Sequence, residues 1–485
     1  MGMNYKTPGI YTERKASNSI VVQGVSTSIA GFVGVTSWGD AEDVTKNFCT
    51  SWSDFQNKMC YGRSTPFMKS AYLAFAVYSF FLNGGTKIYI SRVTDGTAAK
   101  ARYTAQIAGS WVTIEAKGEG ADGNLISIKT SVNELYPDTF DMVITNGIET
   151  ETYSQLSNDE TEERYWIDYV TMQSGFVKCI GGNLSAFSIQ LAGGSDGTDN
   201  LLDRHYLEAL QKFDAIDDVT LLAIPGLTSI AGITGFIDFL DNHQFMFGVI
   251  DAPMTYTTQE LKTLRQKLSC RNAVMLDTWH KINDPLSTVD GKLRNIPTSG
   301  AYQGIVAYIQ EHIGPWRDPA GTMAKINGAL ELVFNAQKGD TDILNPLGII
   351  SIVTKKNYGI CVWGSRSITP DSGYLYVSAI LLDIYLRKSI EEECQPLVFE
   401  PNKGEDVGTL WTRIISTASS FLEFVMNNGG FASRKSEEAY YVKCDEELNP
   451  KSVTDRGYCI TEVGYAYARP AEFIVFRFQN EIKTA

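Results

Sequence analysis

The sequence has few of the residues that metal sites and histidine-dependent catalysis need. Its 485 residues include four histidines and eight cysteines, and no two cysteines form a Cys-x-x-Cys pair. The histidines, at positions 205, 243, 280 and 312, form neither His-Glu-x-x-His nor His-x-His. We therefore expect no metal site, and we interpret the cysteines as free, mostly buried thiols of a protein made in a reducing cytoplasm.

Basic residues are also fewer than acidic residues in this sequence. The chain has 42 lysines and arginines against 56 acidic residues, which gives a formal net charge of −14. A protein that coats nucleic acid needs a basic face to release counterions, so that class is excluded. No Gly-x-x-x-x-Gly-Lys-Ser/Thr loop is present, so no nucleotide is expected. The acidic balance fits a protein that self-repulsion keeps dispersed until it assembles.

Long hydrophobic runs are absent as well. The longest run near the N-terminus, residues 73–82, has about half of the ~20 residues that a membrane-spanning helix needs. The first fifteen residues lack the apolar stretch of a secretory signal, so we expect neither membrane insertion nor secretion by that route. With 44% hydrophobic and 11% aromatic residues, the chain can nevertheless fill several packed cores.

The order of apolar and polar runs predicts a multidomain α+β and α/β fold. We expect a mixed-sheet core built from N-terminal and C-terminal parts with helices, an inserted all-β domain, and extended arms at both ends. The segments are a linking arm at 1–22, a first α/β part at 23–99, an outward-facing β insert at 100–192, an α/β domain at 193–370, a C-terminal domain at 371–478 and a tail at 479–485.

Alternation of strands and helices predicts the individual elements. Apolar strands between helices imply a sheet that is buried on both faces. Residues 296–336 are expected to be irregular at first and helical afterwards. The expected helices span residues 51–59, 67–82, 201–213, 229–241, 257–268, 373–391 and 406–428. The expected strands of the α/β and C-terminal parts span residues 29–40, 87–93, 219–225, 245–253, 272–279, 348–363 (a pair), 439–444, 457–467 and 472–478.

A few residues allow an enzymatic alternative. Asp251 and Asp277 lie near the ends of predicted parallel strands, where α/β enzymes place an acid and a base. Residues 193–197, Gly-Gly-Ser-Asp-Gly, could hold a phosphate, but they lack the lysine and we favour a turn. Trp316 and Trp363 could stack on a ligand, although buried anchors are commoner. The alternative is therefore a hydrolase-like or sugar-acting α/β enzyme with a β insert.

Both ends of the chain look unable to fold alone. The first residues are rich in strand formers but have no local partner, and a single strand is unstable in water. Residues 457–478 predict a strand, a proline turn and a second, almost wholly apolar strand. An open sheet edge there would promote aggregation unless a neighbour covered it. We therefore expect the N-terminal arm to pair with the C-terminal sheet of another copy.

Motifs along the whole sequence, in the same order, resemble those of contractile tail sheath proteins. They combine glycine and proline turns with apolar strands, and each is weak alone. They are TPGIYTER (7–14), STSIAGFVGVTSWG (26–39), FFLNGGTKIYISRV (80–93), GADGN (120–124), LAGGSDG (191–197), VTLLAIPG (219–226), VIDAP (249–253), IPTSGAYQGIVAYIQEHIGPWRDPAG (296–321) followed by Gly328, ILNPLGIISI (343–352), CVWGSRSI (361–368), FEPN (399–402) and RPAEFIVFRF (469–478).

This resemblance implies a structural protein and not an enzyme. Such sheath subunits form hexameric rings that stack helically around an inner tube, and a metastable extended sheath contracts to drive the tube through a target envelope. The implied partners are further copies of the chain, the inner tail tube protein, and baseplate and tail terminator proteins. No catalytic residue, cofactor, metal, nucleic acid or membrane insertion is expected. The implied location is a virion tail or phage-tail-like particle that is assembled in the bacterial cytoplasm.

The resemblance also suggests three groups of contact residues. The arm residues, which would add a strand to a neighbour by β-augmentation, are Tyr5, Pro8, Gly9, Ile10, Tyr11, Ile20, Val21 and Val22. The residues of the sheet that accepts an arm are Tyr458, Ile460, Val463, Phe473, Val475 and Phe476. The residues that face the tube, on or before the amphipathic helix at 406–428, are Lys403, Glu405, Asp406, Arg413 and Glu423.

Overall fold

A computed structural model of the chain describes residues 24–60, 71–107, 109–147, 149–287, 289–402 and 409–478. The expected N-terminal arm at 1–22 and the tail at 479–485 therefore lie outside the described residues. In the part that is described, no helix is both long and apolar enough to cross a membrane.

A six-stranded sheet forms the centre of the body. Its strand order is β16-β12-β11-β10-β1-β2, and all neighbouring strands are parallel. The strands are β1 (Ala30–Gly34), β2 (Ile88–Arg92), β10 (Leu221–Ala223), β11 (Phe247–Asp251), β12 (Ala273–Leu276) and β16 (Ile349–Ile350). The predicted mixed sheet is thus corrected to a parallel one. Helical crossovers explain the difference, because they return the chain to the same end of the sheet each time.

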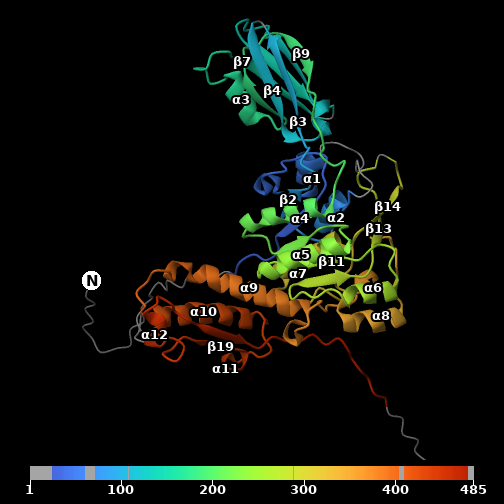
Figure 1. Cartoon of the computed structure of the whole chain (residues 1–485), viewed down its shortest axis with the longest axis vertical. Helices are drawn as coiled ribbons and strands as arrows, with labels where there is room; N and C mark the ends of the chain where they lie inside the picture. Colours follow the sequence, from blue (N-terminus) through green and yellow to red (C-terminus); the bar gives the residue numbers. More distant parts are fainter. Residues whose placement is uncertain are drawn as a thin grey trace, which may run out of the picture.

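Helices cover both faces of this sheet (Figure 1). Phe75, Tyr302 and Ile380 belong to the apolar core on one face, and Phe213, Phe236 and Leu261 belong to the core on the other. The first face is covered by α2 (Leu73–Leu82), α7 (Ser299–His312) and α9 (Val377–Cys394). The second is covered by α4 (Asp203–Gln211), α5 (Ile230–Asn242) and α6 (Thr258–Arg265). Strands that are buried on both faces confirm the expected α/β layering.

Helix α7 approaches α2 closely because of two glycines. A Cβ atom on Gly300 would lie 2.3 Å from the carbonyl oxygen of Ala76, and one on Gly304 would lie 2.4 Å from that of Phe80. The prediction for 296–336 had the order reversed, since the helix comes first and residues 313–330 are irregular. Glycine disfavours an isolated helix, but the tight packing of α7 against α2 overrides that propensity.

Residues 100–190 form two antiparallel sheets around a separate core, in the lobe at the top of Figure 1. One sheet holds β3 (Lys100–Ile107), β4 (Ser110–Glu119) and β8 (Val177–Gly181). The other holds β7 (Thr150–Leu156), β6 (Phe140–Thr145), β5 (Ser127–Val132) and β9 (Phe187–Gln190). The expected all-β insert is corrected by α3 (Trp166–Gln173), whose Trp166 and Val170 are fully buried in this core.

The C-terminal part packs α10 (Leu410–Asn427) against α9 and against a two-stranded hairpin of β19 (Tyr440–Lys443) and β20 (Glu462–Tyr465). Phe421, Leu422 and Val425 of α10 are fully buried, which confirms the expected one-sided apolar face of this helix. The expected strand at 472–478 is not formed: these residues lie outside every strand of the described residues, and residues 473–478 are exposed. A strand needs a pairing edge, and no other strand of the described residues pairs with this segment.

Shorter elements complete the body. Helix α1 (Trp52–Phe55) precedes α2, and α8 (Lys338–Leu344) packs against α6. A small antiparallel sheet holds β14 (Leu293–Ile296), β13 (His280–Asn283) and β15 (Glu331–Leu332), and a hairpin holds β17 (Ile352–Lys355) and β18 (Gly359–Val362). Short helices α11 (Ser436–Ala439) and α12 (Lys451–Thr454) flank the C-terminal hairpin strand β19.

Candidate functional site

The two aspartates of the enzymatic alternative are buried and serve the fold. Asp251, at the end of β11, accepts hydrogen bonds from the Ser299 backbone N–H (2.9 Å) and hydroxyl (2.5 Å). It therefore caps the first turn of α7. Asp277, directly after β12, accepts a hydrogen bond from the backbone N–H of Ile352 at 3.0 Å. Each residue is only 2% exposed, so neither carboxyl group can reach a dissolved substrate.

Burial shifts the protonation of these groups strongly. It raises the pKa of Asp251 to about 6 and that of Asp277 to about 7, and it lowers the pKa of nearby His280 to about 4. A shift of this kind marks active sites in many enzymes. Here the groups lie inside the core, and their hydrogen bonds join strands to α7 and β17. We interpret them as structural groups.

The Asp277→Asn variant should remove much of the pH dependence of stability. The pKa of Asp277 in the folded state is raised above its ordinary value of 3.8, so the folded protein retains a proton that the unfolded chain loses as the pH rises. The contribution of this carboxyl group to the free energy of unfolding is therefore complete below about pH 4, and it is lost as the pH rises through about 7. When the pH rises from about 5 to about 8, the free energy of unfolding should fall by on the order of 3 kcal/mol more in the wild type than in the variant.

The measurement is denaturant unfolding of both proteins at the two pH values. Asp217→Asn, at an exposed position, is the matched control and should follow the wild type. Equal pH dependence in the wild type and Asp277→Asn would contradict the assignment of a raised pKa to this carboxyl group.

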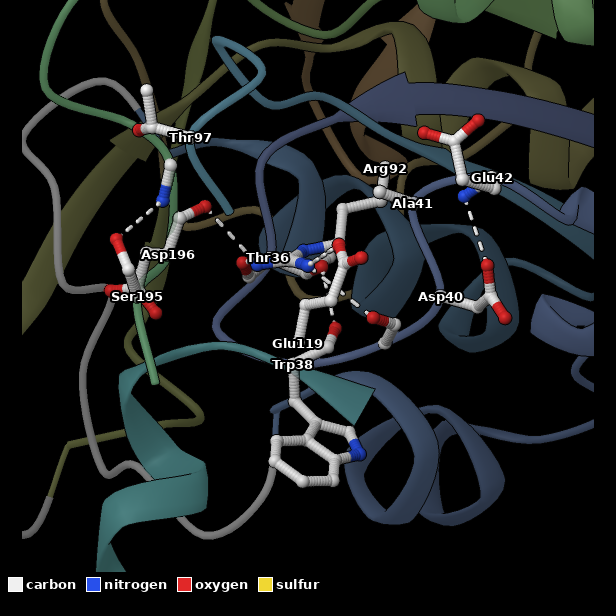
Figure 2. Close-up of polar contacts among 12 residues, drawn as sticks. Thr36, Trp38, Asp40, Ala41, Glu42, Arg92, Thr97, Glu119, Ser195 and Asp196 are labelled. Atoms are coloured by element: carbon white, nitrogen blue, oxygen red, sulfur yellow. Dashed lines mark hydrogen bonds and ion pairs between the residues drawn. The ribbon is translucent and has the colours of Figure 1, made fainter. Parts of the chain in front are cut away.

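A buried arginine joins the β lobe to the body (Figure 2). The side chain of Arg92, at the end of β2, is fully buried, and its guanidinium group contacts three separate segments. It donates to the carbonyls of Thr36 (3.4 Å) and Gly39 (3.3 Å), to the carboxylate of Glu119 at the end of β4 (3.3 Å), and to the carbonyl of Asp196 (3.2 Å). One side chain therefore joins three parts of the lobe: the end of β2 where the chain enters it, the end of β4 at its base, and Asp196 where the chain leaves it.

Beside this junction, two glycine-rich segments, 120–124 and 193–197, form hydrogen bonds with each other at the base of the lobe. The side-chain amide of Asn124 donates to the carbonyl of Gly194 at 2.9 Å and accepts from the Gly194 N–H at 2.8 Å. The carboxylate of Asp196 accepts from the backbone N–H of Ala121 at 2.8 Å. The polar groups of residues 193–197 thus form hydrogen bonds within the protein, which favours the predicted turn over a phosphate-binding site.

A half-buried aspartate also connects two further motifs of the resemblance. Asp318 accepts hydrogen bonds from the Ser365 hydroxyl, from the Ser378 hydroxyl (2.8 Å) and from the Ser378 N–H (3.1 Å) in the first turn of α9. Burial raises the pKa of Asp318, and the serine hydrogen bonds oppose that rise. Trp316 packs against the core of α9 and α10, whereas Trp363 is 41% exposed beneath the Lys355 ammonium group.

The last described segment leaves the body from a polar anchor. The carboxylate of Glu472 binds Arg366, with the guanidinium Nε 3.0 Å from both oxygens, and it accepts from the Tyr376 hydroxyl at 3.2 Å. Beyond this anchor, large apolar side chains are exposed to solvent. They are Phe473 (74% exposed), Ile474 (74%), Val475 (75%), Phe476 (77%) and Phe478 (94%). Figure 1 shows the segment running away from the body, and an apolar patch of this kind marks an interaction site.

The structure brings together only part of the predicted arm-accepting sheet. Val463 lies on β20 opposite Val442 of β19. Tyr458 and Ile460 precede β20 and are 59% and 45% exposed. Phe473, Val475 and Phe476 are corrected from members of that sheet to members of the exposed segment. Among the described residues of one chain, this sheet is therefore the two-stranded hairpin β19–β20.

The other predicted contact residues are described only in part. The eight arm residues, Tyr5 to Val22, lie outside the described residues, and so do Lys403, Glu405 and Asp406. Arg413 and Glu423 lie on α10 and are exposed. Arg413 forms an ion pair with Glu400. The face that they share is polar and opposite the buried face of α10.

Sequence reasoning did not single out Arg92, Arg366 or Glu472. A usable signal exists for Arg92, because a charged residue ends an otherwise apolar strand, Ile88–Arg92, and must find buried partners. Arg366 and Glu472 each lie in a quoted motif, but nothing local in the sequence links them. In the part of the chain that is described, no group of three or more histidine, cysteine or acidic residues could hold a metal ion.

Comparison with known proteins gives sequence and structural relatives, although no family model matches the chain. The chain is 26% identical over 194 residues to the tail sheath protein of Vibrio phage KVP40. The match covers 40% of this chain and 27% of that relative, so it spans about a quarter of the curated protein.

Solved structures match over nearly the whole length. The sheath complex of the extracellular contractile injection system PVC, in its contracted state, has a TM-score of 0.62 at 20% identity, with 99% of each chain covered. The sheath tail protein Lin1278 from Listeria innocua has a TM-score of 0.64 at 14% identity, with 92% of this chain and 96% of that chain covered. The resemblance predicted from the sequence motifs is thus confirmed, and the chain has the fold of contractile tail sheath proteins.

Proposed function

We propose that this chain is the structural sheath subunit of a contractile tail or injection machine. It polymerises as hexameric rings stacked around an inner tube and contracts from a metastable extended state. The observation that carries the proposal is the exposed apolar segment 473–478, anchored at Glu472 on a body with the sheath fold. Such a surface is unfavourable on a monomer and requires a partner.

The partner proposed for this segment is another copy of the chain. In the described part of the chain the hairpin β19–β20 has two strands, so its outer edges can accept further strands through main-chain hydrogen bonds. We assign one added strand to the apolar segment of one neighbour and another to the N-terminal arm of a second neighbour. This arrangement links subunits by flexible connections while their bodies rotate and slide during contraction.

The remaining parts take their roles from this arrangement. We propose that residues 23–99 and 193–370 form the sheath body, that 100–192 project outward, and that 371–478 face the tube. The partners are the inner tube, baseplate and terminator proteins, within a virion tail or phage-tail-like particle assembled in the bacterial cytoplasm. No enzymatic step is assigned, because contraction releases free energy that is stored during assembly.

Reversing charges on the outer face of α10 should weaken binding of the tube. Arg413→Glu combined with Glu423→Lys keeps the net charge and leaves the buried face intact. It places each new charge opposite a like charge of a tube surface that is complementary to the wild type. We expect about a tenfold or greater drop in tube protein that co-sediments with the sheath.

The matched control, which also keeps the net charge, combines Lys129→Glu with Glu163→Lys at exposed positions of the β lobe, which is proposed to point away from the tube. Co-sedimentation is measured for both variants after their folding is checked by circular dichroism. Full tube loading by the α10 variant would show that this face does not contact the tube.

A further inference from the structure

Two thiols lie side by side at the base of the C-terminal hairpin. The Sγ atoms of Cys444, directly after β19, and Cys459, shortly before β20, are 3.8 Å apart. Both are reduced in this structure. Cys49, Cys270 and Cys361 differ, because their thiols lie against oxygen atoms of Asn47, Asp241 and Tyr358.

A buried amide holds this pair in place. The side chain of Asn449, which is 3% exposed, donates to the carbonyl of Ile460 at 2.8 Å and accepts from the Ile460 N–H at 2.6 Å. Its amide nitrogen also lies 3.6 Å from the sulfur of Cys444. Asn449 therefore ties the residue after Cys459 to the loop that begins at Cys444, and the two sulfurs face each other with little freedom to separate.

We propose that Cys444 and Cys459 form a reversible disulfide that closes the loop between β19 and β20 when the protein meets an oxidising medium. The bond needs the sulfurs to approach to about 2 Å, which side-chain rotation can supply from the present separation. This proposal does not depend on the proposed function. The geometry of the two thiols is a property of the single chain, whatever that chain assembles into.

The surroundings favour a disulfide over a metal site. Structural zinc needs four ligands. The cluster around the pair is apolar instead, with Leu397, Leu410 and Trp411 among its members. Cys394 packs against the same cluster and is the one competing thiol that this cluster contains.

The reaction requires a small disulfide as oxidant, such as oxidised glutathione. Cys459 is partly exposed, so its thiolate attacks one sulfur of the oxidant, forms a mixed disulfide and releases the first glutathione thiol. Cys444, only 3% exposed, then loses its proton and attacks the Cys459 sulfur, which releases the second glutathione thiol. Two protein thiols are oxidised, and one glutathione disulfide is reduced to two thiols.

The thiols should react slowly at neutral pH. Burial and the neighbouring Cys444 thiol raise the pKa of Cys459 to about 12, so little thiolate is present. A slow reaction keeps the pair reduced during synthesis and brief stress, and long exposure oxidises it. The resulting cross-link spans 15 residues, includes α12, and fixes the start of the strand that leads to the exposed C-terminal segment.

The test uses the full chain, first reduced and then held with excess oxidised glutathione in mildly alkaline buffer. After denaturation and alkylation, mass spectrometry should find six modified cysteines of the eight in the chain, against eight in the reduced sample. Trypsin should yield a linked pair of peptides, one that begins at Cys444 and one that begins at Gly457. Cleavage at Lys451 or Arg456 should give fragments that separate on a gel only after reduction.

Three variants complete the test. Cys444→Ser should stop at a mixed disulfide of Cys459 with glutathione, and Cys459→Ser should keep all seven remaining thiols. Neither should give the linked peptides, whereas Cys394→Ser should still lose two thiols and give them. The wild-type peptide map does not require any variant to fold. Eight free thiols after prolonged oxidation, a link that involves Cys394, or a link between two chains would each overturn the proposal.

Discussion

Deleting residues 473–485 should abolish polymerisation and leave a folded monomer. The described part of this segment is apolar and exposed, so its removal costs the monomer almost no buried contact. The same side chains would be covered in an assembly, where burying a large apolar side chain contributes about 1.5–3 kcal/mol. Sedimentation velocity should show loss of all species larger than the monomer, with a melting temperature close to that of the wild type.

Two matched truncations make this result specific. Removing only 479–485 keeps the apolar residues and should leave assembly intact. Removing 1–22 deletes the N-terminal arm and should also prevent tubes of normal length, if that arm adds a strand to a neighbour's hairpin. Tubes of normal length from the arm-deleted chain would refute the arm proposal, and tubes from the 473–485 deletion would refute the role of the apolar segment.

The Arg92→Ala variant should have the largest effect on stability of any single change considered. Removing the guanidinium group leaves three carbonyls and the Glu119 carboxylate without their donor in a buried site. Burial lowers the pKa of Arg92 and raises that of Glu119, so desolvation outweighs the attraction between them. Loss of one partner from such a pair typically costs about 3–5 kcal/mol.

The measurement is denaturant unfolding, with limited proteolysis of residues 94–99 and 193–199 at the neck of the β lobe. Cleavage there should rise in Arg92→Ala, because the side chain joins both strands of the neck. Arg102→Ala, at an exposed position of the lobe, should stay within about 0.5 kcal/mol of the wild type. A stability of Arg92→Ala equal to that of this control would show that the junction does not hold the lobe.

Local patterns predicted most of the helices and strands of the body. Continuous apolar runs such as that at 245–253 indicated strands buried on both faces, and β11 confirms this. The stripe of Phe421 and Val425 predicted the buried face of α10. Helix α3 was missed although Trp166 and Val170 have helical spacing, because the expected β pattern of the lobe was extended across it.

Contacts between distant residues could not be predicted in this way. Arg92 and Asp196 are 104 residues apart, and Arg366 and Glu472 are 106 residues apart. Periodicity tells which face of an element is buried but not which polar groups meet there. The strand expected at 472–478 failed for a related reason, since an apolar sequence can form a strand only where an edge accepts it.

The most direct test of the account is electron microscopy of the purified full chain over a wide range of concentrations. The account predicts striated hollow tubes with hexameric symmetry, whose density places segment 473–478 of one subunit beside the β19–β20 hairpin of another. Discrete particles of constant size at every concentration would contradict the claim that this chain polymerises as a sheath.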